Sequence, residues 1–397
     1  MIEKMKILVV CQHYYPENFV IYKIAEGLLK EGHDVTVLTG KPNYGYPDIM
    51  PEYKNVSYEE INGVKVHRVD IHPRGKTKMD KIKNYLTFWK NSKKWVKNTK
   101  EEFDAVYSMS ISPVTILSAG NLYKKLHHVK HIVHCVDLWP ESVLVTNAVR
   151  KHSLTYRILY SWSKKIYKCA DTILISSPTF KDYFKKVLKL PCNNIHYAPQ
   201  PSLVEINDGL RKPLGPGFHI LYCGNLGIIQ EIDLIPQAMQ LVKNDNVTFH
   251  VIGMGPRVED LKKMVNDMHL RGRVIYHGAL PAKKAAPYFK ACDVSYISLK
   301  DDGYVGKTIP NKLMMSMAFG KPILGVLNGD GKDVIEDAKC GFTCLADPKE
   351  VAKTIDMMSK LTEGEIKRLG QNAKTYYFEK FSIEKVSQEI STYLQKE

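Results

Sequence analysis

The sequence predicts two α/β domains, each a doubly wound parallel sheet covered by helices. Three observations predict this fold. Short β-rich runs alternate with longer amphipathic stretches, the alternation lapses once near the middle of the chain, and it then restarts. The length of 397 residues fits two such domains, each long enough to bury a core of its own.

The predicted strands of the first half are short and rich in Val, Ile and Leu, and helical stretches separate most of them. They are Lys6–Cys11, Asp34–Thr39, Val64–Ile71, Asp104–Met109, His131–Asp137, Thr172–Ser177 and Ile195–Ala198. The following segment, 201–217, is rich in Pro and Gly and has no periodicity, which predicts a linker. We therefore expect an N-terminal domain over residues 1–200.

The second half repeats the pattern and defines a C-terminal domain over residues 218–375. Its predicted strands are His219–Cys223, Val247–Ile252, Val274–His277, Val294–Ile297, Pro322–Leu327 and Phe342–Leu345. Helical stretches over 363–378 and 382–396 close the chain, and residues 376–397 are expected to pack back on the N-terminal domain. Two such Rossmann-like domains are expected to face each other across a central cleft, lined by the carboxyl ends of their strands.

Composition excludes several classes of protein. The eight cysteines are scattered without a zinc-binding spacing, so we interpret them as reduced thiols of a cytoplasmic protein. The longest run without Lys, Arg, Asp or Glu, Ala105–Tyr123, contains Pro113, Gly120 and several serines, and is not expected to span a membrane. No segment has the pattern of a secretory signal.

Charge is unevenly distributed along the chain. Residues 1–200 hold 31 Lys and Arg against 18 Asp and Glu, whereas residues 201–397 hold 26 against 24. An anionic partner is therefore expected for the first half.

Two glycine-bearing segments follow predicted strands in the second half. In Tyr222–Gly227, the loop Gly224-Asn225-Leu226-Gly227 would let backbone N–H groups approach a phosphate, although an ordinary turn between strand and helix has the same pattern. The other segment, Gly253–Pro256, has only two of the three glycines of a dinucleotide fingerprint, with Val258 at the third position. It is better interpreted as a structural tight turn.

A helix is predicted to begin near Pro310-Asn311-Lys312 and to end at Gly320, with Pro322 forbidding its continuation. Lys307 precedes the helix and Lys312 lies in its first turn. The positive end of a helix with two lysines nearby suits a diphosphate. A connector helix with solvated lysines is the alternative.

Polar residues also follow the predicted strand His131–Asp137. Asp137 and Glu141 could accept hydrogen bonds from sugar hydroxyls, and the indole of Trp139 could pack on a pyranose ring. A capping or ion-pair role for Asp137 remains open. Alternation within the strand places His134 on the opposite face, so we expect a core histidine there.

Taken together, these segments resemble the retaining glycosyltransferases of family 4, which have the GT-B fold, and especially the branch found in bacterial capsule, O-antigen and exopolysaccharide clusters. The resemblance covers nearly the whole chain. It extends over Lys6–Val10, Tyr15–Glu17, Gly32–Gly40, Pro42–Tyr44, Asp137–Ser142, Gly224–Gly227 with Gln230, Gly253–Gly255, His277-Gly278, Pro310–Lys312 and Gly320–Pro322.

The resemblance implies a role for each matching position. Gly224, Asn225, Leu226 and Gly227, with Pro310, Asn311 and Lys312, are expected to hold the diphosphate of a nucleotide-sugar donor. The main chain near Gly278 and Leu280 is expected to contact the base, and Asp137 and Glu141 to face the sugar. Lys307 and Lys312 would stabilise the leaving diphosphate in a front-face displacement that needs no cofactor and no essential metal.

The sequence departs from the family pattern at three places. Lys307 and Met315 stand where many members have two glutamates, the second of which binds the donor ribose. Asn225 and the pair Gln230-Glu231 stand where many have an Arg and a Lys. Asn18-Phe19 replaces a glycine pair after the first strand.

We therefore expect a hexosyl- or N-acetylhexosaminyltransferase that uses a UDP-sugar in bacterial surface polysaccharide synthesis. A nucleotide-sugar epimerase of the same architecture and a non-enzymatic basic binding or scaffold protein are the alternatives. No nucleic-acid-binding motif is present, so a nucleic-acid partner is not expected.

Two basic clusters with interleaved aromatic residues predict a membrane surface as a further partner. Arg74–Lys100 holds ten Lys and Arg with Tyr85, Phe88, Trp89 and Trp95, and Arg150–Lys168 holds six with no acidic residue. On a helix, Ile82, Tyr85, Phe88 and Trp89 form one stripe, which could instead face the core. We expect peripheral attachment to the anionic inner face of a bacterial cell membrane, where a lipid-linked saccharide acceptor would be found.

Overall fold

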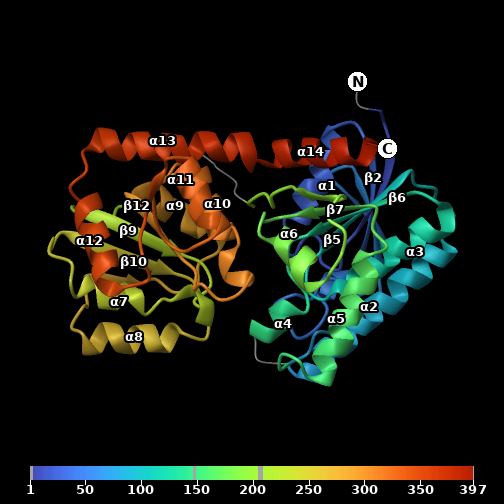
Figure 1. Cartoon of the computed structure of the whole chain (residues 1–397), viewed down its shortest axis with the longest axis horizontal. Coiled ribbons are helices and arrows are strands. Elements are labelled where there is room, and N and C mark those ends of the chain that lie inside the picture. Colours follow the sequence, from blue (N-terminus) through green and yellow to red (C-terminus); the bar gives the residue numbers. More distant parts are fainter. Residues whose placement is uncertain (1–2, 146–148, 204–208, 397) are drawn as a thin grey trace. The chain divides into compact units, whose positions relative to one another are not determined.

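The computed structural model describes residues 3–145, 149–203 and 209–396. The chain forms two compact units (Figure 1). The N-terminal unit combines Met1–Leu203 with Ile383–Glu397, and the C-terminal unit is Val204–Ser382.

The N-terminal unit contains an eight-stranded sheet in the order β3-β4-β2-β1-β5-β6-β7-β8. Its strands are β1 (Lys6–Val10), β2 (Asp34–Gly40), β3 (Tyr58–Ile61), β4 (Val64–Val69), β5 (Ala105–Ser110), β6 (Lys130–Cys135), β7 (Thr172–Ile175) and β8 (Ile195–Tyr197). All neighbours pair in parallel except β3 with β4. The central strand β1 is almost entirely apolar, as expected where helices cover both faces of a sheet.

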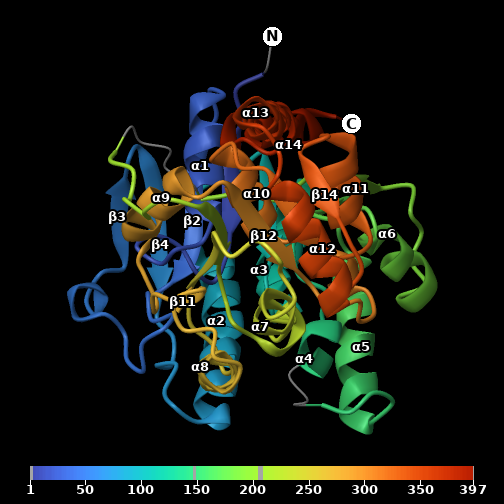
Figure 2. The same ribbon diagram turned by 90° about the vertical axis from the view of Figure 1, so that its left-hand side faces the viewer.

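The helices of this unit are α1 (Ile21–Lys30), α2 (Lys78–Asn98), α3 (Ser118–His127), α4 (Glu141–Val145), α5 (Leu154–Tyr167), α6 (Phe180–Asp182) and α14 (Ile383–Gln395), with shorter turns at Pro51–Tyr53, Val114–Leu117 and Tyr183–Val187. A capping box fixes the start of α2, in which Thr77 and Asp80 each bind the other's backbone N–H. In α14, Val386, Ile390 and Leu394 recur every four residues and enter the same core as α1. Figures 1 and 2 both show α14 next to α1.

The C-terminal unit contains a six-stranded parallel sheet in the order β11-β10-β9-β12-β13-β14. Its strands are β9 (Phe218–Cys223), β10 (Val247–Ile252), β11 (Val274–Tyr276), β12 (Val294–Ser298), β13 (Ile323–Val326) and β14 (Gly341–Thr343). Its helices are α7 (Leu234–Met239), α8 (Val258–Asp267), α9 (Ala282–Ala291), α10 (Asn311–Ala318), α11 (Asp330–Asp337), α12 (Pro348–Met358) and α13 (Glu363–Lys380), with short turns at Ile228–Gln230 and Val305–Lys307. The predicted architecture of two doubly wound α/β sheets is confirmed.

The structure differs from the sequence predictions at two places. The short strand β3 is absent from the predicted set because Tyr58-Glu59-Glu60-Ile61 is polar and lies at the sheet edge. The predicted boundary at residue 376 falls inside α13, whose Tyr377 is buried in the C-terminal core, and the chain rejoins the N-terminal unit only at Ile383.

The predicted linker 201–217 is partly outside the described residues, which omit 204–208. Beyond that gap, Lys212 N–H donates to the Pro287 carbonyl at 3.0 Å and the Arg211 guanidinium donates to the Ala291 carbonyl at 3.3 Å. The end of the linker therefore lies along α9 of the C-terminal unit. Among the helices that the structure describes, none combines the length and the apolar character needed to cross a bilayer.

Candidate functional site

The direction in which the chain winds reverses between β9 and β12 in the C-terminal unit. The chain goes from β9 to β10 and β11 on one side and to β12, β13 and β14 on the other. In open α/β sheets, ligands bind outside the carboxyl ends of the strands at such a switch point. Here hydrogen bonds join the turn Ile228–Gln230, which follows β9, to the end of β12 and the loop after it. Ser298 Oγ donates to the Gln230 carbonyl at 2.5 Å, and Lys300 N–H donates to the Ile229 carbonyl at 2.7 Å.

The loop after β9 is the predicted phosphate loop, Gly224–Gly227. Gly224 has φ +157°, a conformation that favours glycine, and Gly253 packs directly against it. A Cβ at Gly253 would lie 1.8 Å from the Gly224 carbonyl oxygen, and one at Gly255 would lie 2.3 Å from the Leu226 carbonyl oxygen. The Gly253–Gly255 segment is thus a structural tight turn, as predicted, and the structure adds that it supports the Gly224–Gly227 loop.

The loop after β11 joins the same edge. Gly253 N–H donates to the Gly278 carbonyl at 2.9 Å, and Leu280 and Met315 both pack against the same apolar cluster, which contains Leu221 and Ile252. The main chain of Gly278 is therefore next to the tight turn that supports the phosphate loop. Met315, where the resemblance leads us to expect a glutamate, contributes to packing at this position.

Lys312 lies in the first turn of α10, and its side chain reaches the phosphate loop. Its ammonium donates to the Tyr222 hydroxyl at 2.8 Å and lies 4.5 Å from the centre of the Tyr222 ring. A Cβ at Gly224 would be 3.7 Å from Lys312 Nζ. Desolvation lowers the pKa of this partly buried amine to about 7, although the nearby Cys223 acts in the opposite direction.

The other predicted residues of this unit have different surroundings. Lys307 is exposed, and its ammonium lies 4.0 Å from Asp301 Oδ1. Pro310 is the N-cap of α10, one position before the helical turn expected for it, and Asn311 is exposed as the first helical residue. The structure thus brings Gly224–Gly227, Gly278 and Lys312 together around one edge of the sheet.

Asp137 lies in the connection between β6 and α4 of the N-terminal unit, and Glu141 is the first residue of α4. Desolvation raises the pKa of the Asp137 carboxyl to about 6, although hydrogen bonds from the Ser142 and Ser112 hydroxyls act in the opposite direction. The Glu141 carboxylate accepts a hydrogen bond from the Tyr156 hydroxyl at 2.7 Å. Among the described residues, no cation lies within ion-pair distance of Asp137, which argues against the ion-pair alternative.

Two neighbours of Asp137 test further expectations. His134 is fully buried between the Tyr107 hydroxyl, 2.7 Å from Nδ1, and the Ala198 carbonyl, 2.9 Å from Nε2, so the predicted core histidine is confirmed. Burial lowers the pKa of His134 to about 4. Trp139 is also buried, with 6% of its surface exposed, because it packs into the N-terminal unit. The expectation of an open indole platform for a sugar is therefore wrong.

A buried polar cluster at the carboxyl ends of β1 and β2 was not predicted. The Glu17 carboxylate accepts hydrogen bonds from the backbone N–H groups of Asn43 at 2.7 Å and Tyr44 at 2.5 Å, and contacts His13 Nδ1 at 3.0 Å. The His13 ring stacks on Phe19 and meets Tyr44 edge-on. The segments Tyr15–Glu17 and Pro42–Tyr44 are both part of the family resemblance, but nothing in the sequence indicates that they contact each other.

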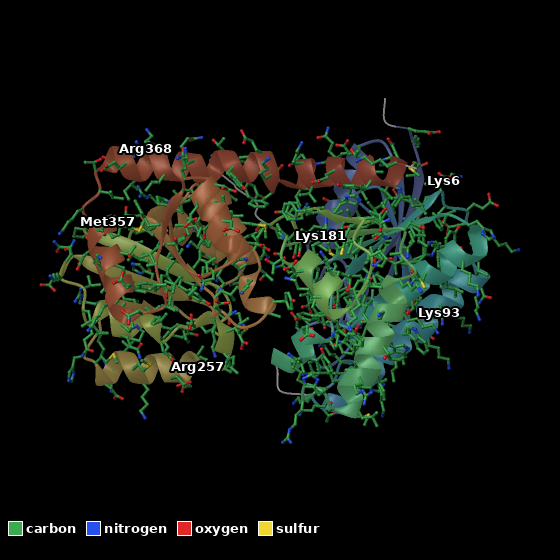
Figure 3. The ribbon with its side chains drawn as sticks, in the orientation of Figure 1. Lys6, Lys93, Lys181, Arg257, Met357 and Arg368 are labelled. Atoms are coloured by element: carbon green, nitrogen blue, oxygen red, sulfur yellow. The ribbon has the colours of Figure 1, made fainter. Side chains whose placement is uncertain are left out.

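The two basic clusters contain helices α2 and α5 (Figure 1). The Trp89 and Trp162 rings meet with 6.1 Å between their centres, and Lys93, labelled in Figure 3, lies 4.8 Å above the Trp89 ring. Phe88 is buried, so the predicted stripe is wrong at this residue because it faces the core. Large apolar side chains nevertheless remain exposed on both helices, and we call them the apolar ridge: Met79, Ile82 and Leu86 on α2, with Leu154, Ile158 and Trp162 on α5.

Two family models match the chain in tandem. Residues 18–200 match the glycosyl transferase 4-like domain, and residues 217–362 match glycosyl transferases group 1. The second match contains the phosphate loop and α10, and the first contains Asp137 and Glu141.

One curated relative and two solved structures show what the chain is similar to. The chain is 28% identical to the probable glycosyltransferase WbjE of Pseudomonas aeruginosa over 63% of its own length, and this alignment spans 65% of that relative. Sucrose-phosphate synthase of Thermosynechococcus elongatus superposes with a TM-score of 0.73 at 16% identity, over 98% of both chains. HepE of Anabaena, solved in complex with UDP and glucose, superposes with a TM-score of 0.70 at 16% identity, over 99% of this chain and 100% of that one.

These structural likenesses show the fold, and the family models cover most of each unit. The chain is therefore a glycosyltransferase of the GT-B fold, built from a glycosyl transferase 4-like domain followed by a glycosyl transferases group 1 domain.

Proposed function

We propose that the protein transfers a sugar from a UDP-sugar to a hydroxyl of an acceptor saccharide, with retention of anomeric configuration. The observation that carries this proposal is the switch point between β9 and β12, where the Gly224–Gly227 backbone, the Gly278 main chain and the Lys312 ammonium meet. Such an edge suits a nucleoside diphosphate. HepE, which shares the fold, is described in complex with UDP and glucose.

In the proposed reaction, the acceptor oxygen forms a bond to the anomeric carbon while the bond from that carbon to the diphosphate oxygen breaks. The acceptor proton passes to the departing diphosphate on the same face of the sugar. Lys312 and the backbone N–H groups of the loop would stabilise the charge that develops on this leaving group. Donors of this kind contribute ~3–4 kcal/mol each in enzymes where they have been removed.

The roles of the remaining predicted residues follow from this scheme. Lys307 is proposed to approach the diphosphate from the loop after β12, and Asp137 and Glu141 to accept hydrogen bonds from sugar hydroxyls. Because lysine and backbone donors supply the positive charge, we infer that no resident metal is required. A chelator such as EDTA is then expected to leave the transfer rate unchanged.

Mass spectrometry of purified protein incubated with a panel of UDP-sugars and saccharide acceptors tests the proposal. The expected product is the acceptor enlarged by one hexose or N-acetylhexosamine. A donor sugar converted to its epimer without any acceptor product would favour the epimerase alternative. Calorimetry that detects no binding of UDP or of any UDP-sugar at about millimolar concentration would overturn the proposal.

We further propose that the acceptor is lipid-linked and that α2 and α5 attach the enzyme to the anionic inner leaflet of a bacterial membrane, as surface polysaccharide synthesis requires. The apolar ridge supports this because Leu154 is 74% exposed and lies at four-residue intervals from Ile158 and Trp162. Exposed lysines surround the ridge on α2. Each Lys or Arg near an anionic leaflet contributes about 1 kcal/mol, which suffices in combination for reversible binding.

Co-sedimentation with vesicles tests the attachment. Binding is expected with anionic but not with neutral vesicles, and high salt should weaken it. Replacing Lys90, Lys93, Lys94 and Lys97 by Glu should abolish it, as should Leu154→Ser with Ile158→Ser. Reversal of three exposed lysines of the C-terminal unit, Lys349, Lys353 and Lys360, is a control that should leave binding intact. Equal recovery in the supernatant with both vesicle types at low salt would contradict the proposal.

A further inference from the structure

The neighbours of the Lys312 ammonium are uncharged. It donates to the Tyr222 hydroxyl at 2.8 Å and lies 4.5 Å from the centre of that ring. The Tyr222 hydroxyl in turn donates to the Asn225 carbonyl, so that Tyr222 links Lys312 to the phosphate loop. Among the described residues, no carboxylate lies within 4.0 Å of Lys312 Nζ.

The acidic groups of the surrounding loops interact with other lysines. Glu231, which follows the turn Ile228–Gln230, interacts with Lys300, and Asp301 lies 4.0 Å from Lys307. On β9, Lys312 interacts with Tyr222 and Cys223, and burial raises the pKa of the Cys223 thiol to about 12. In the part of the chain that the structure describes, Lys312 therefore meets no formal negative charge near neutral pH.

The face of α10 that packs against α13 is apolar. It carries Leu313, Met314 and Met317, which lie in one cluster with Ala373 and Tyr377 of α13. Of the residues that the structure describes, the ionisable groups that α13 adds to this cluster are two phenols, Tyr377 and the partly buried Tyr376. The charge state of Lys312 is decided on its β9 side, where the phosphate loop lies.

A partly buried ammonium with only a phenol and a ring for neighbours loses solvation without a compensating charge. The pKa of Lys312 is accordingly lowered to about 7 by desolvation. A ligand anion at the phosphate loop would reverse this effect, because an opposite charge within a few ångströms favours the ammonium. The loop has no cationic side chain of its own, since residues 224–227 are Gly, Asn, Leu and Gly.

We propose that binding of the donor diphosphate is coupled to the uptake of one proton by Lys312, and that Tyr222 is the positioning residue that holds this amine under the phosphate loop. The inference rests on the proposed function, because it assumes that a diphosphate binds at Gly224–Gly227. The proton comes from the solvent when the nucleotide binds and returns to it when UDP leaves. Lys312 therefore gains and loses one proton in each catalytic cycle.

Calorimetric titration of UDP in two buffers of different ionisation enthalpy measures the uptake directly. At about pH 8 the phosphates of UDP are fully ionised, so any proton taken up is bound by the protein. The wild type is expected to take up close to one proton, and Lys312→Met is expected to bind UDP more weakly with no uptake.

A second partly buried lysine provides the matched control. The Lys321 ammonium donates to the carbonyls of Cys292 at 2.7 Å and Lys290 at 3.2 Å, away from the phosphate loop, and desolvation also lowers its pKa. Lys321→Met should leave the proton uptake unchanged. The wild-type comparison of buffers remains decisive even where a lysine variant fails to fold.

Tyr222→Phe separates positioning from a structural role. Loss of the hydroxyl removes an acceptor for the ammonium, so the free amine should titrate at a lower pH. The pH above which the Kd for UDP begins to rise should shift downward. A merely structural role would instead weaken UDP binding equally at every pH.

Different outcomes would overturn the proton coupling and the proposed function. Tight UDP binding whose heat does not depend on the buffer would overturn the proton coupling and leave nucleotide binding intact. Uptake that persists in Lys312→Met would assign the proton to another group. Absence of UDP binding at every pH would overturn the proposed function itself.

Discussion

At the scale of single residues, the ionised Asp137 carboxylate destabilises the folded protein, whereas a neutral side chain at this position would not. Desolvation raises its pKa from 3.8 to about 6 in the folded protein. Between these two values the folded state holds a proton that the unfolded state has lost, so stability falls as the pH rises through this window. Below about pH 4 both states are protonated, and above about pH 6 the destabilisation is complete.

We therefore predict that Asp137→Asn makes the N-terminal unit more stable than the wild type by ~1–3 kcal/mol at pH 8, with little difference near pH 4. Transfer activity should fall at the same time, because the variant lacks the proposed hydrogen-bond acceptor. Urea unfolding followed by tryptophan fluorescence measures this, since all four tryptophans lie in residues 1–203. A variant that is less stable at pH 8 would show that the carboxylate has a structural capping role.

Residues that act through distant partners were the ones that the sequence did not predict. Alternation along β6 placed His134 in the core correctly, because that inference needs only one strand. Tyr222 lies within an apolar strand and has the pattern of a core residue, and only the fold brings Lys312, 90 positions later, to its hydroxyl. Glu17 likewise meets Asn43 and Tyr44 through the neighbouring strand β2.

At the scale of elements, the strands and their order of winding were predictable because buried parallel strands are continuous apolar runs. The edge strand β3 was not, because Glu59 and Glu60 interrupt any such run. The function of a glycine turn also depends on what packs against it. Gly253 and Gly272 both have positive φ, but only Gly253 contacts the phosphate loop.

The comparison of Gly253 with Gly272 predicts how strongly the phosphate loop depends on the turn that supports it. Gly272→Ala, with open space around the new methyl group, should cost about 1–2 kcal/mol for its backbone conformation alone. Gly253→Ala should cost ~1–3 kcal/mol more, because its Cβ would lie 1.8 Å from the Gly224 carbonyl oxygen and must displace that loop. UDP affinity should fall in Gly253→Ala only. Equal losses of stability and unchanged UDP binding in both variants would refute the role of Gly253 as a support.

At the scale of the whole molecule, the last helix belongs to the first unit. Gly27 of α1 lets α14 approach closely, because a Cβ there would lie 2.0 Å from Ser387 Oγ, and His33 Nε2 lies 2.7 Å from Ser391 Oγ. The sequence predicted the return of the chain from the position of its final amphipathic stretch. It could not fix the crossing point at Ile383, because Tyr377 and Ile390 are both apolar residues on helices and differ only in which core they enter.

Truncation of a buried side chain on α14 is therefore expected to destabilise the N-terminal unit and not the C-terminal unit. Ile390→Ala is expected to destabilise the N-terminal unit by ~2–5 kcal/mol, since Ile390 is fully buried among residues of α1 and the first sheet. The tryptophan-detected unfolding midpoint in urea should fall accordingly, although residue 390 is far from every tryptophan in the sequence. Ile355→Ala, an equal truncation in the C-terminal core, should leave that midpoint unchanged and reduce amide-exchange protection of β9 and β10 instead. If Ile390→Ala lowered the protection of β9 and β10 while the tryptophan transition stayed in place, α14 would have to be assigned to the C-terminal unit.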